Sequence, residues 1–388
     1  MKRLVGALIS FFMMFTLLGS QSVFAAEKQA ELSNDSKSAI LIERDTGTIL
    51  YDKNSNEKLP PASMTKIMTM LLIMEALDSG KLSLEEKVRT SEYAASMGGS
   101  QIFLEPGEEM KVKEMLLAIS IGSANDASVA MAEKIAGSEE AFVDLMNKKA
   151  ASLGLKNTHF KNTTGLTAKD HYSTAHDMAM MAKELLKHEE ITDFTKMYES
   201  YLRENTDNKF WLVNTNKLVK FYPGVDGLKT GFTRDAMYCL TATAKKDGMR
   251  VIAVVFGAPT SKSRNAQITK MLDFSFSQYA THPVYKKGAT LGKVKISKGN
   301  IKDIKAVTGE SVSVLTKKGE KLDQITKEVK LKDHLKAPIH KGEEVGMLII
   351  KKDGKVLVKT ALTAEKSVKR ASWWDLYKRS FGLFTHSK

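Results

Sequence analysis

The sequence predicts an α+β fold, in which an antiparallel sheet packs against a helical segment and a smaller β-rich domain follows. Three observations support this prediction. Apolar and polar residues alternate near both ends of about the first 280 positions, helical periodicity fills the stretch between them, and short β-type runs rich in Gly and Lys come next. With 388 residues, 43% of them hydrophobic and 27% charged, the chain is long enough for two globular domains, and disorder is not the default.

The first 25 residues have the composition of a cleavable export signal. Two basic residues precede an apolar stretch at about 4–18, and the small residues Val23 and Ala25 stand just before the expected cleavage site. The alternative is a retained membrane anchor, but the stretch is shorter than the roughly 20 apolar residues that a span needs. We therefore expect a signal peptide at 1–25 and an exported protein that acts at the outer face of the membrane.

The first folded domain is predicted at 35–282. Alternation around an Asp-Thr-Gly turn indicates an antiparallel hairpin from Ser38 to Tyr51. Helical spacing then runs from Ser63 to about Asp78 and dominates as far as about His188. Three further strands are predicted in GVDGLKTGF, AMYCLTATAKKDG and MRVIAVVFGA. The sheet should therefore collect the first and the last segments of this domain.

The C-terminal third of the chain differs from the preceding part in both its residue pattern and its charge. Runs such as ATLGKVKI and SVSVLTKK predict a small β domain at 283–367. Residues 283–388 carry 25 Lys and Arg against 11 Asp and Glu, whereas 26–282 carry 32 against 34. In an exported protein this basic surface favours anionic wall polymer or lipid head groups as partners, and not nucleic acid.

The last residues predict an amphipathic, membrane-anchoring helix at 368–388. Within 371–384, seven apolar and mostly aromatic side chains fall on one half of a helical wheel, and charged residues lie opposite. Aromatic residues with flanking cations suit a helix that lies in the membrane interface. The alternative is a helix that packs on its own protein.

Cysteine and histidine usage predicts no metal and no cofactor. The single cysteine, Cys239, excludes an internal disulfide, and its strand-like surroundings indicate a small buried apolar residue. His171 and His176 lack nearby partners at a metal-binding spacing.

The stretch PPASMTKIMT places Ser63 and Lys66 three residues apart at the start of a predicted helix. A serine there is a helix N-cap by default, and S-x-x-K alone occurs by chance in many chains. However, residues i and i+3 of a helix share a face, so a neutral Lys66 could take the proton of the Ser63 hydroxyl. The helix dipole and a second nearby cation would favour that neutral form.

Two more motifs follow in a suggestive order. SAN at 123–125 lies between two helical patterns, where its alternative role is an N-cap before Asp126. KTG at 229–231 ends a strand pattern, where it could be a plain turn, and Gly231 would let a substrate backbone come close. All three motifs in this order, in an exported chain, are hard to obtain by accident.

On these motifs the sequence resembles the serine-type D-alanyl-D-alanine carboxypeptidases, the low-molecular-weight penicillin-binding proteins of the peptidase S11 family. The resemblance covers Ser38–Asp273 and includes GGSQIFLEPGE, NTHFKNTTGL, HYSTAHDMA and GVDGLKTGFT. It extends to the β domain and to the C-terminal helix, which is the membrane anchor in the family. It implies a penicillin-binding or β-lactamase-like catalytic domain. Within the family, the sequence is most similar to enzymes of spore-forming Gram-positive bacteria, which suggests a role in sporulation.

The resemblance also implies roles for individual residues. Ser63 would attack the penultimate D-Ala carbonyl of the peptidoglycan stem peptide, with Lys66 as general base. Ser123 would pass a proton to the leaving D-alanine, and Asn125 would bind the substrate amide and position Lys66. A β-lactam would acylate Ser63 and stay bound.

Further along, the family pattern implies a substrate-binding strand. Lys229 and Thr230 would hold the terminal carboxylate, and the backbone N–H groups of Ser63 and Phe232 would form the oxyanion hole. Gly231 and Thr233 complete the predicted substrate-binding set. One departure is Met237, where the family pattern has a glycine, and a side chain there could alter turnover.

Other functions remain open at this point. A β-lactamase is disfavoured because no E-x-x-L-N run supplies a deacylating glutamate between Asn125 and Lys229. A DD-endopeptidase or transpeptidase would share the same residues and differ only in its substrate. A non-catalytic wall-binding protein would be expected to lose at least one of Ser63, Lys66, Ser123 and Lys229, and all four are present.

Overall fold

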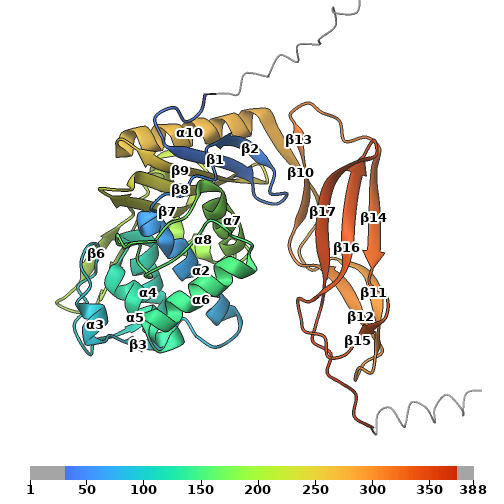
Figure 1. Ribbon diagram of the computed structural model, residues 1–388, viewed down its shortest axis with the longest axis horizontal. Helices are drawn as coiled ribbons and strands as arrows, with labels where there is room; N and C mark the ends of the chain where they lie inside the picture. The colour runs from blue at the N-terminus through green and yellow to red at the C-terminus, as the bar shows by residue number, and fades with distance from the viewer. Residues whose placement is uncertain (1–30, 374–388) are drawn as a thin grey trace, which may run out of the picture. The chain divides into compact units, whose positions relative to one another are not determined.

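The computed structural model describes residues 31–373, and its first part is built on a five-stranded antiparallel sheet (Figure 1). The strand order β2-β1-β9-β8-β7 places the N-terminal hairpin beside strands that come almost 200 residues later. The sheet therefore collects the first and the last segments, as alternation in the sequence predicts. Its strands are β1 (Ser38–Glu43), β2 (Ile49–Lys53), β7 (Val225–Thr233), β8 (Met237–Lys246) and β9 (Met249–Ala258).

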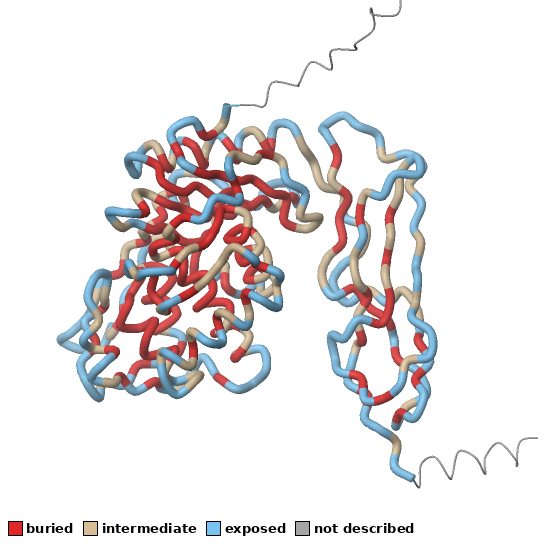
Figure 2. The backbone as a smooth tube through the Cα atoms, in the orientation of Figure 1, coloured by how far each residue is buried: buried red, intermediate tan, exposed pale blue. Residues whose placement is uncertain are grey.

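The central strands of this sheet are buried on both faces (Figure 2). In β1, Ile40 and Ile42 join the core under the helical segment, whereas Ala39 and Leu41 join a second core formed with α10 (Ser261–Gln278). Burying an aliphatic side chain of this size stabilises the fold by about 1.5–3 kcal/mol. The sheet is thus a rigid support for β7, the strand that carries the K-T-G motif.

The segment between the two parts of the sheet is mainly helical, with α5 and α7 packed around the buried helix α2. Two short two-stranded antiparallel sheets, β3–β4 and β5–β6, interrupt it. The helices are η1 (Ala62–Thr65), α2 (Lys66–Asp78), α3 (Glu92–Ala95), α4 (Val112–Leu117), η2 (Ala118–Gly122), α5 (Asn125–Ala136), α6 (Glu139–Ser152), α7 (Ala175–Leu185), α8 (Ile191–Thr195) and α9 (Leu218–Phe221). The strands of these two sheets are β3 (Lys87–Arg89), β4 (Glu109–Lys111), β5 (Glu199–Leu202) and β6 (Phe210–Val213).

Residues 279–364 form strands β10 to β17 and the turns between them, with an apolar core of their own that includes Val314, Leu348 and Leu362. A β10–β13 ladder accompanies a six-stranded sheet in the order β14-β16-β17-β12-β11-β15. The strands are β10 (Tyr279–Tyr285), β11 (Thr290–Ser297), β12 (Asp303–Thr308), β13 (Val312–Lys317), β14 (Ile325–Leu331), β15 (Leu335–Lys336), β16 (Glu344–Lys352) and β17 (Lys355–Ala364).

The predicted α+β class is confirmed, and two features were not predicted. Strand β10 spans the position of the expected domain boundary between 282 and 283. Helix α10, which covers one face of the sheet, begins where Thr260 Oγ1 accepts the backbone N–H of Ser263 (3.0 Å). All of the predicted signal peptide (1–25) and most of the predicted anchoring helix (368–388) lie outside the described residues.

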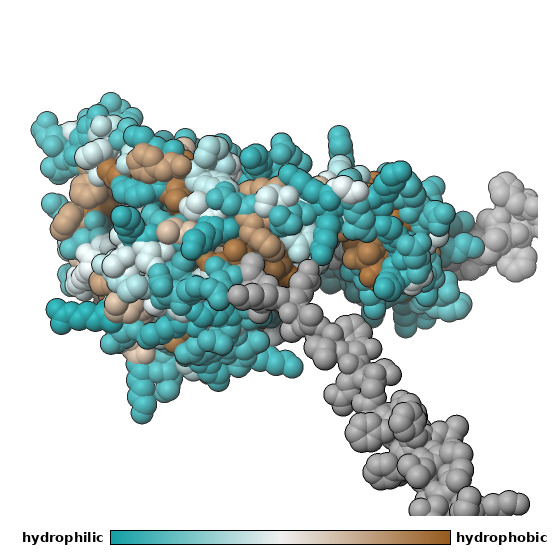
Figure 3. Space-filling model, turned by 90° about the horizontal axis from the view of Figure 1, so that it is seen from above, coloured by the Kyte–Doolittle hydropathy of each residue, from teal (hydrophilic) through white to brown (hydrophobic). Residues whose placement is uncertain are grey.

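Within residues 31–373, no helix is long and apolar enough to cross a membrane. On the face seen in Figure 3, hydrophilic side chains cover most of the surface, and hydrophobic side chains form smaller patches between them.

Candidate active site

Ser63 lies in a single 3-10 turn, η1, that leads directly into α2. Before it, Ala62 has a left-handed φ of 48°, which turns the chain sharply. Neither η1 nor α2 has a side-chain cap, so the default N-cap role of a serine at this place does not apply to the described structure. The Ser63 hydroxyl instead lies 3.1 Å from Lys66 Nζ.

Lys66 is the first residue of α2, and its side chain is fully buried. Its Nζ lies 2.7 Å from both Asn125 Oδ1 and the Thr164 carbonyl oxygen. A neutral amine has two N–H donors and one lone pair. It can therefore donate to these two oxygens while its lone pair accepts the hydroxyl proton of Ser63.

The electrostatics of the site favour that neutral form. Burial lowers the pKa of Lys66 well below its ordinary value, and the positive charge of Lys229 lowers it further. The carboxylate of Asp126 opposes the shift to a smaller extent. A lysine held in this way can act as a general base near neutral pH.

Ser123 and Asn125 stand at the junction between the π-helical turn η2 and α5. Ser123 is buried and has a left-handed φ of 64°, an uncommon conformation for serine that is enriched at functional sites. The Asn125 side chain is fixed at both ends, because its Nδ2 donates to the Gly98 carbonyl oxygen (2.7 Å) while its Oδ1 faces Lys66. The amide orientation that Lys66 requires is therefore built into the fold.

Lys229 and Thr230 lie on β7, which packs on η1. Burial, with a smaller contribution from the nearby Arg264, lowers the pKa of Lys229 to about 7. The Lys229 Nζ donates only a 3.2 Å hydrogen bond to the Thr230 carbonyl oxygen among the described residues. The Thr230 hydroxyl donates to Thr215 Oγ1 (2.7 Å), so both groups are held on the strand next to the nucleophile.

The structure explains the glycine at position 231 by packing within the protein, which differs from the explanation expected from the sequence. A Cβ at this position would lie 2.8 Å from the Pro61 carbonyl oxygen and 3.1 Å from Ala62 Cβ. The glycine thus allows β7 to approach the turn that carries Ser63. The predicted close approach of a substrate backbone stays a prediction.

The two residues after the K-T-G motif, Phe232 and Thr233, are the last two residues of β7. Phe232 is 52% exposed, and its ring stacks on Tyr238 with centroids 4.5 Å apart. The Thr233 hydroxyl accepts the Ala236 N–H (3.1 Å), so it closes the turn to β8. Beyond that turn, Met237 has a left-handed φ of 57°, which explains physically why a glycine would suit this position.

Sequence reasoning missed two residues that act through their backbone. Thr164 supplies a carbonyl oxygen to Lys66, and Gly165 has a φ of +85°. A Cβ on Gly165 would lie 1.8 Å from the Ala62 carbonyl oxygen and 2.9 Å from the Ser63 nitrogen. The NTTGL run that contains both residues was visible in the sequence, but no side-chain chemistry marked their roles.

A second unpredicted feature is the clamp on the loop of residues 96–108, which joins α3 to β4. Asp126, at the start of α5, accepts the N–H groups of Ile102 and Leu104 (3.0 and 3.1 Å). From the other side, Arg203 donates to the carbonyl oxygens of Ile102 and Phe103 (3.1 and 3.4 Å). The loop that also provides Gly98 to Asn125 is therefore held at two points.

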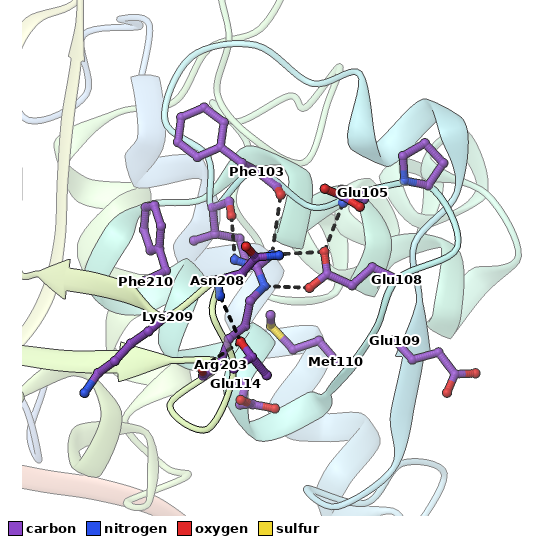
Figure 4. Close-up of a pocket in the computed structure, with 13 residues that line it drawn as sticks. Phe103, Glu105, Glu108, Glu109, Met110, Glu114, Arg203, Asn208, Lys209 and Phe210 are labelled. Carbon is purple, nitrogen blue, oxygen red and sulfur yellow. Dashed lines mark hydrogen bonds and ion pairs between the residues drawn. The ribbon is translucent and has the colours of Figure 1, made fainter.

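Arg203 itself lies beside a cavity of about 720 Å³ (Figure 4). Its guanidinium forms two hydrogen bonds with the carboxylate of Glu108, at 2.6 and 3.0 Å. Phe103 is 64% exposed and makes an edge contact with Phe210, whose ring lies on the same side of Arg203 in Figure 4. Two aromatic rings therefore line this cavity, one on the loop of residues 96–108 and one on β6.

No group of His, Cys, Asp and Glu residues in the described part of the chain is arranged to hold a metal ion. Cys239 is free and fully buried, as its apolar surroundings predict, and burial raises the pKa of its thiol to about 11.

Comparison with known proteins identifies relatives along the whole chain. Residues 24–260 match the family model described as D-alanyl-D-alanine carboxypeptidase (peptidase S11), and residues 279–370 match the C-terminal domain of penicillin-binding protein 5. The D-alanyl-D-alanine carboxypeptidase DacF of Bacillus subtilis is 63% identical over all of both chains. These matches confirm the resemblance that the motifs indicated.

Solved structures agree with this result. Penicillin-binding protein 5 from Haemophilus influenzae has a TM-score of 0.68 and 29% identity, over 87% of this chain and 98% of its own. Penicillin-binding protein D2 from Listeria monocytogenes, solved in its ampicillin-bound form, has a TM-score of 0.54 and 31% identity, over 62% of this chain and 98% of its own.

Proposed function

The chain belongs to the peptidase S11 family of D-alanyl-D-alanine carboxypeptidases, and from this premise we propose that it removes the C-terminal D-alanine of peptidoglycan pentapeptide stems through an acyl-enzyme on Ser63. The observation that carries this proposal is the buried Lys66, whose Nζ lies 3.1 Å from Ser63 Oγ and has a pKa well below the ordinary value. The pair supplies a nucleophile and its base in one helical turn.

In the acylation step, neutral Lys66 takes the hydroxyl proton as Ser63 Oγ bonds to the penultimate D-Ala carbonyl carbon. The contacts of Lys66 with Asn125 and the Thr164 carbonyl oxygen become stronger once the amine is charged. The backbone N–H groups of Ser63 and Phe232 would stabilise the oxyanion.

The leaving group departs when the C–N bond breaks and the nitrogen of D-alanine gains a proton. We assign this transfer to the Ser123 hydroxyl, which is buried beside Asn125 at the S-x-N turn. Ser123 would give its own proton to the nitrogen and receive in exchange the proton that Lys66 took from Ser63, so that Lys66 becomes neutral again. The substrate carboxylate would lie against Lys229 and Thr230. An arriving carboxylate raises the pKa of a nearby amine, so binding favours the charged form of Lys229.

Water then hydrolyses the ester and releases the shortened stem with Ser63 restored. A β-lactam would follow the first step and remain on Ser63, because its ring opens without producing a leaving group that diffuses away. The protein would therefore be sensitive to penicillins, consistent with the ampicillin-bound relative from Listeria monocytogenes.

The test is D-alanine release from a soluble peptide ending in Lys-D-Ala-D-Ala, with residues 26–370 and the Ser63→Ala form compared. Release that depends on Ser63 supports the proposal. If the folded protein binds penicillin covalently but releases no D-alanine, the carboxypeptidase assignment is wrong and cross-linked dimers should be tested for endopeptidase activity.

We also propose that the protein is exported, loses residues 1–25 and is attached to the outer face of the membrane through 371–388. The sequence of the signal-like N-terminus and the two-sided helical wheel of 371–384 support this location. Deletion of 371–388 should weaken sedimentation of the protein with membranes, and sedimentation equal to that of the undeleted chain would refute the anchor.

A further inference from the structure

Unpaired positive charge gathers at one end of the C-terminal β sheet. This basic end consists of the segments 297–303, 333–337 and 366–371. It carries six exposed cations, and none of them forms an ion pair with another described residue. The cations are Lys298, Lys302, Lys336, Lys366, Lys369 and Arg370. Two exposed carboxylates, Asp303 and Asp333, lie in the same segments and leave a clear positive excess.

Backbone hydrogen bonds hold these segments side by side. The Ala371 nitrogen donates to the Lys298 carbonyl oxygen (2.9 Å), and the Asn300 nitrogen donates to the Lys369 carbonyl oxygen (2.8 Å). Strand β15 pairs in parallel with the end of β11 and brings Lys336 to the same edge. The cations therefore belong to one folded surface built from distant parts of the sequence.

The opposite end of the sheet is different. Near the β16–β17 hairpin, Lys351 pairs with Glu328 (2.9 Å) and Lys352 pairs with Glu320 (2.6 Å). These two lysines are neutralised locally, and Lys318, Lys321 and Lys355 near them are not. At the basic end, in contrast, none of the six cations has an ion pair among the described residues. Exposed cations at high local density repel one another, and a negatively charged partner would relieve this repulsion. The six unpaired cations therefore favour such a partner.

The position of the basic end indicates which partner. The described residues end at Trp373, next to this end of the sheet, and the segment that we propose as the membrane anchor begins at 371 (Figure 1). Trp373, the last described residue, is 71% exposed at this place. Cations adjacent to an anchor lie within a Debye length of the lipid head groups, where attraction to an anionic surface is strong.

We infer that the basic end is a docking surface for a bilayer containing anionic phospholipids. The folded β domain then binds the membrane itself, in addition to the anchor, and its rotation about the anchor is restricted. The inference rests on the proposed anchoring for its choice of partner, but its own contacts are those of residues 297–303, 333–337 and 366–371.

The experiment compares two variants of the chain from residue 26 that lose the same net charge. The test variant changes Lys298, Lys302, Lys369 and Arg370 to Gln, and the matched control changes Lys318, Lys321, Lys355 and Lys359 to Gln. All eight are exposed and lack an ion pair among the described residues. Partitioning onto vesicles with one-third phosphatidylglycerol is measured with and without 374–388, since that deletion removes no described residue.

Each cation near an anionic surface changes partitioning by about fivefold, so the four substitutions of the test variant should weaken binding by about 600-fold, and those of the control by less than about fivefold. Both variants should keep their covalent labelling by penicillin, which reports a folded catalytic part. Equal losses in the two variants would show that only net charge matters and would overturn the inference.

Two further outcomes separate the alternatives. If soluble poly(glycerol phosphate) is bound through the same four residues as tightly as vesicles are, the surface recognises a wall polymer and the bilayer assignment is wrong. If deletion of 374–388 changes nothing while the test variant loses binding, the anchor proposal fails and the basic end stands.

Discussion

Replacing Gly165 with alanine tests whether the loop after Thr164 positions the nucleophile. Gly165 has a φ of +85°, and a Cβ there would meet the Ala62 carbonyl oxygen at 1.8 Å. Real Cβ atoms do not approach closer than 3.0 Å, so the two backbones must move apart. The movement falls on the residue before Ser63 or on the carbonyl group that binds Lys66, and either displacement disturbs the nucleophile and its base.

The size of the effect follows from these distances. The left-handed conformation costs an alanine about 1–2 kcal/mol of stability at any site. Opening the contact requires a shift of about 1.2 Å, and a misplacement of about 1 Å in a catalytic group can cost about 100-fold in rate. We therefore expect Gly165→Ala to lower the rate of acylation by about 100-fold, or about 2.7 kcal/mol.

Gly154→Ala is the matched control. Gly154 has a φ of +72°, but no atom lies within 4 Å of a Cβ built there. It should lose stability like Gly165→Ala and keep its acylation rate within about threefold, because no catalytic group moves. The assay is the rate of covalent labelling by a fluorescent penicillin, with thermal unfolding to establish the folded fraction. If folded Gly165→Ala acylates as fast as the control, the positioning argument is wrong.

Four other changes test the site. Lys66→Arg replaces the neutral amine with a permanent cation that cannot act as a base, so acylation should fall by about 1,000-fold, and a smaller effect would argue against Lys66 as the base. The value of kcat/KM should decline above about pH 7, as Lys229 loses its proton, and Lys229→Arg should abolish this decline in a pH–rate profile. Met237→Gly should change the rate at which the penicillin acyl-enzyme hydrolyses, and equal rates would remove Met237 from consideration. Arg203→Lys keeps the charge but loses the bidentate hydrogen bond to Glu108. We expect KM to rise several-fold and the unfolding temperature to change little. An unchanged KM would mean that Arg203 has only a structural role.

Sequence reasoning located the parts of the site that depend on side-chain chemistry and regular spacing. Ser63 and Lys66 are in contact because three residues along a helical path return to the same face. The Asn125 contact with Lys66 was implied by family resemblance, since spacing alone cannot place two motifs that are about 60 residues apart beside each other. The serine itself stands on a 3-10 turn and not in the regular helix that periodicity suggested.

Features that act through the backbone or through distant packing could not be predicted in this way. The Thr164 carbonyl group is one of many in the chain until the fold brings it to Lys66. The packing role of Gly231 can be seen only when the turn that packs against β7 is known. Helix α10 had a readable signal in the apolar spacing of Ile268, Met271 and Leu272 after the Thr260 cap, but the need for it follows from a sheet that is buried on both faces.

The most direct test of the central claim is to locate the acyl-enzyme. The protein is incubated with a penicillin, its intact mass is measured, and the modified peptide is identified. The account predicts one penicillin per chain, on the peptide that contains Ser63, and no adduct in Ser63→Ala. An adduct on any other residue, or one that persists in Ser63→Ala, would contradict the assignment of Ser63 as the nucleophile.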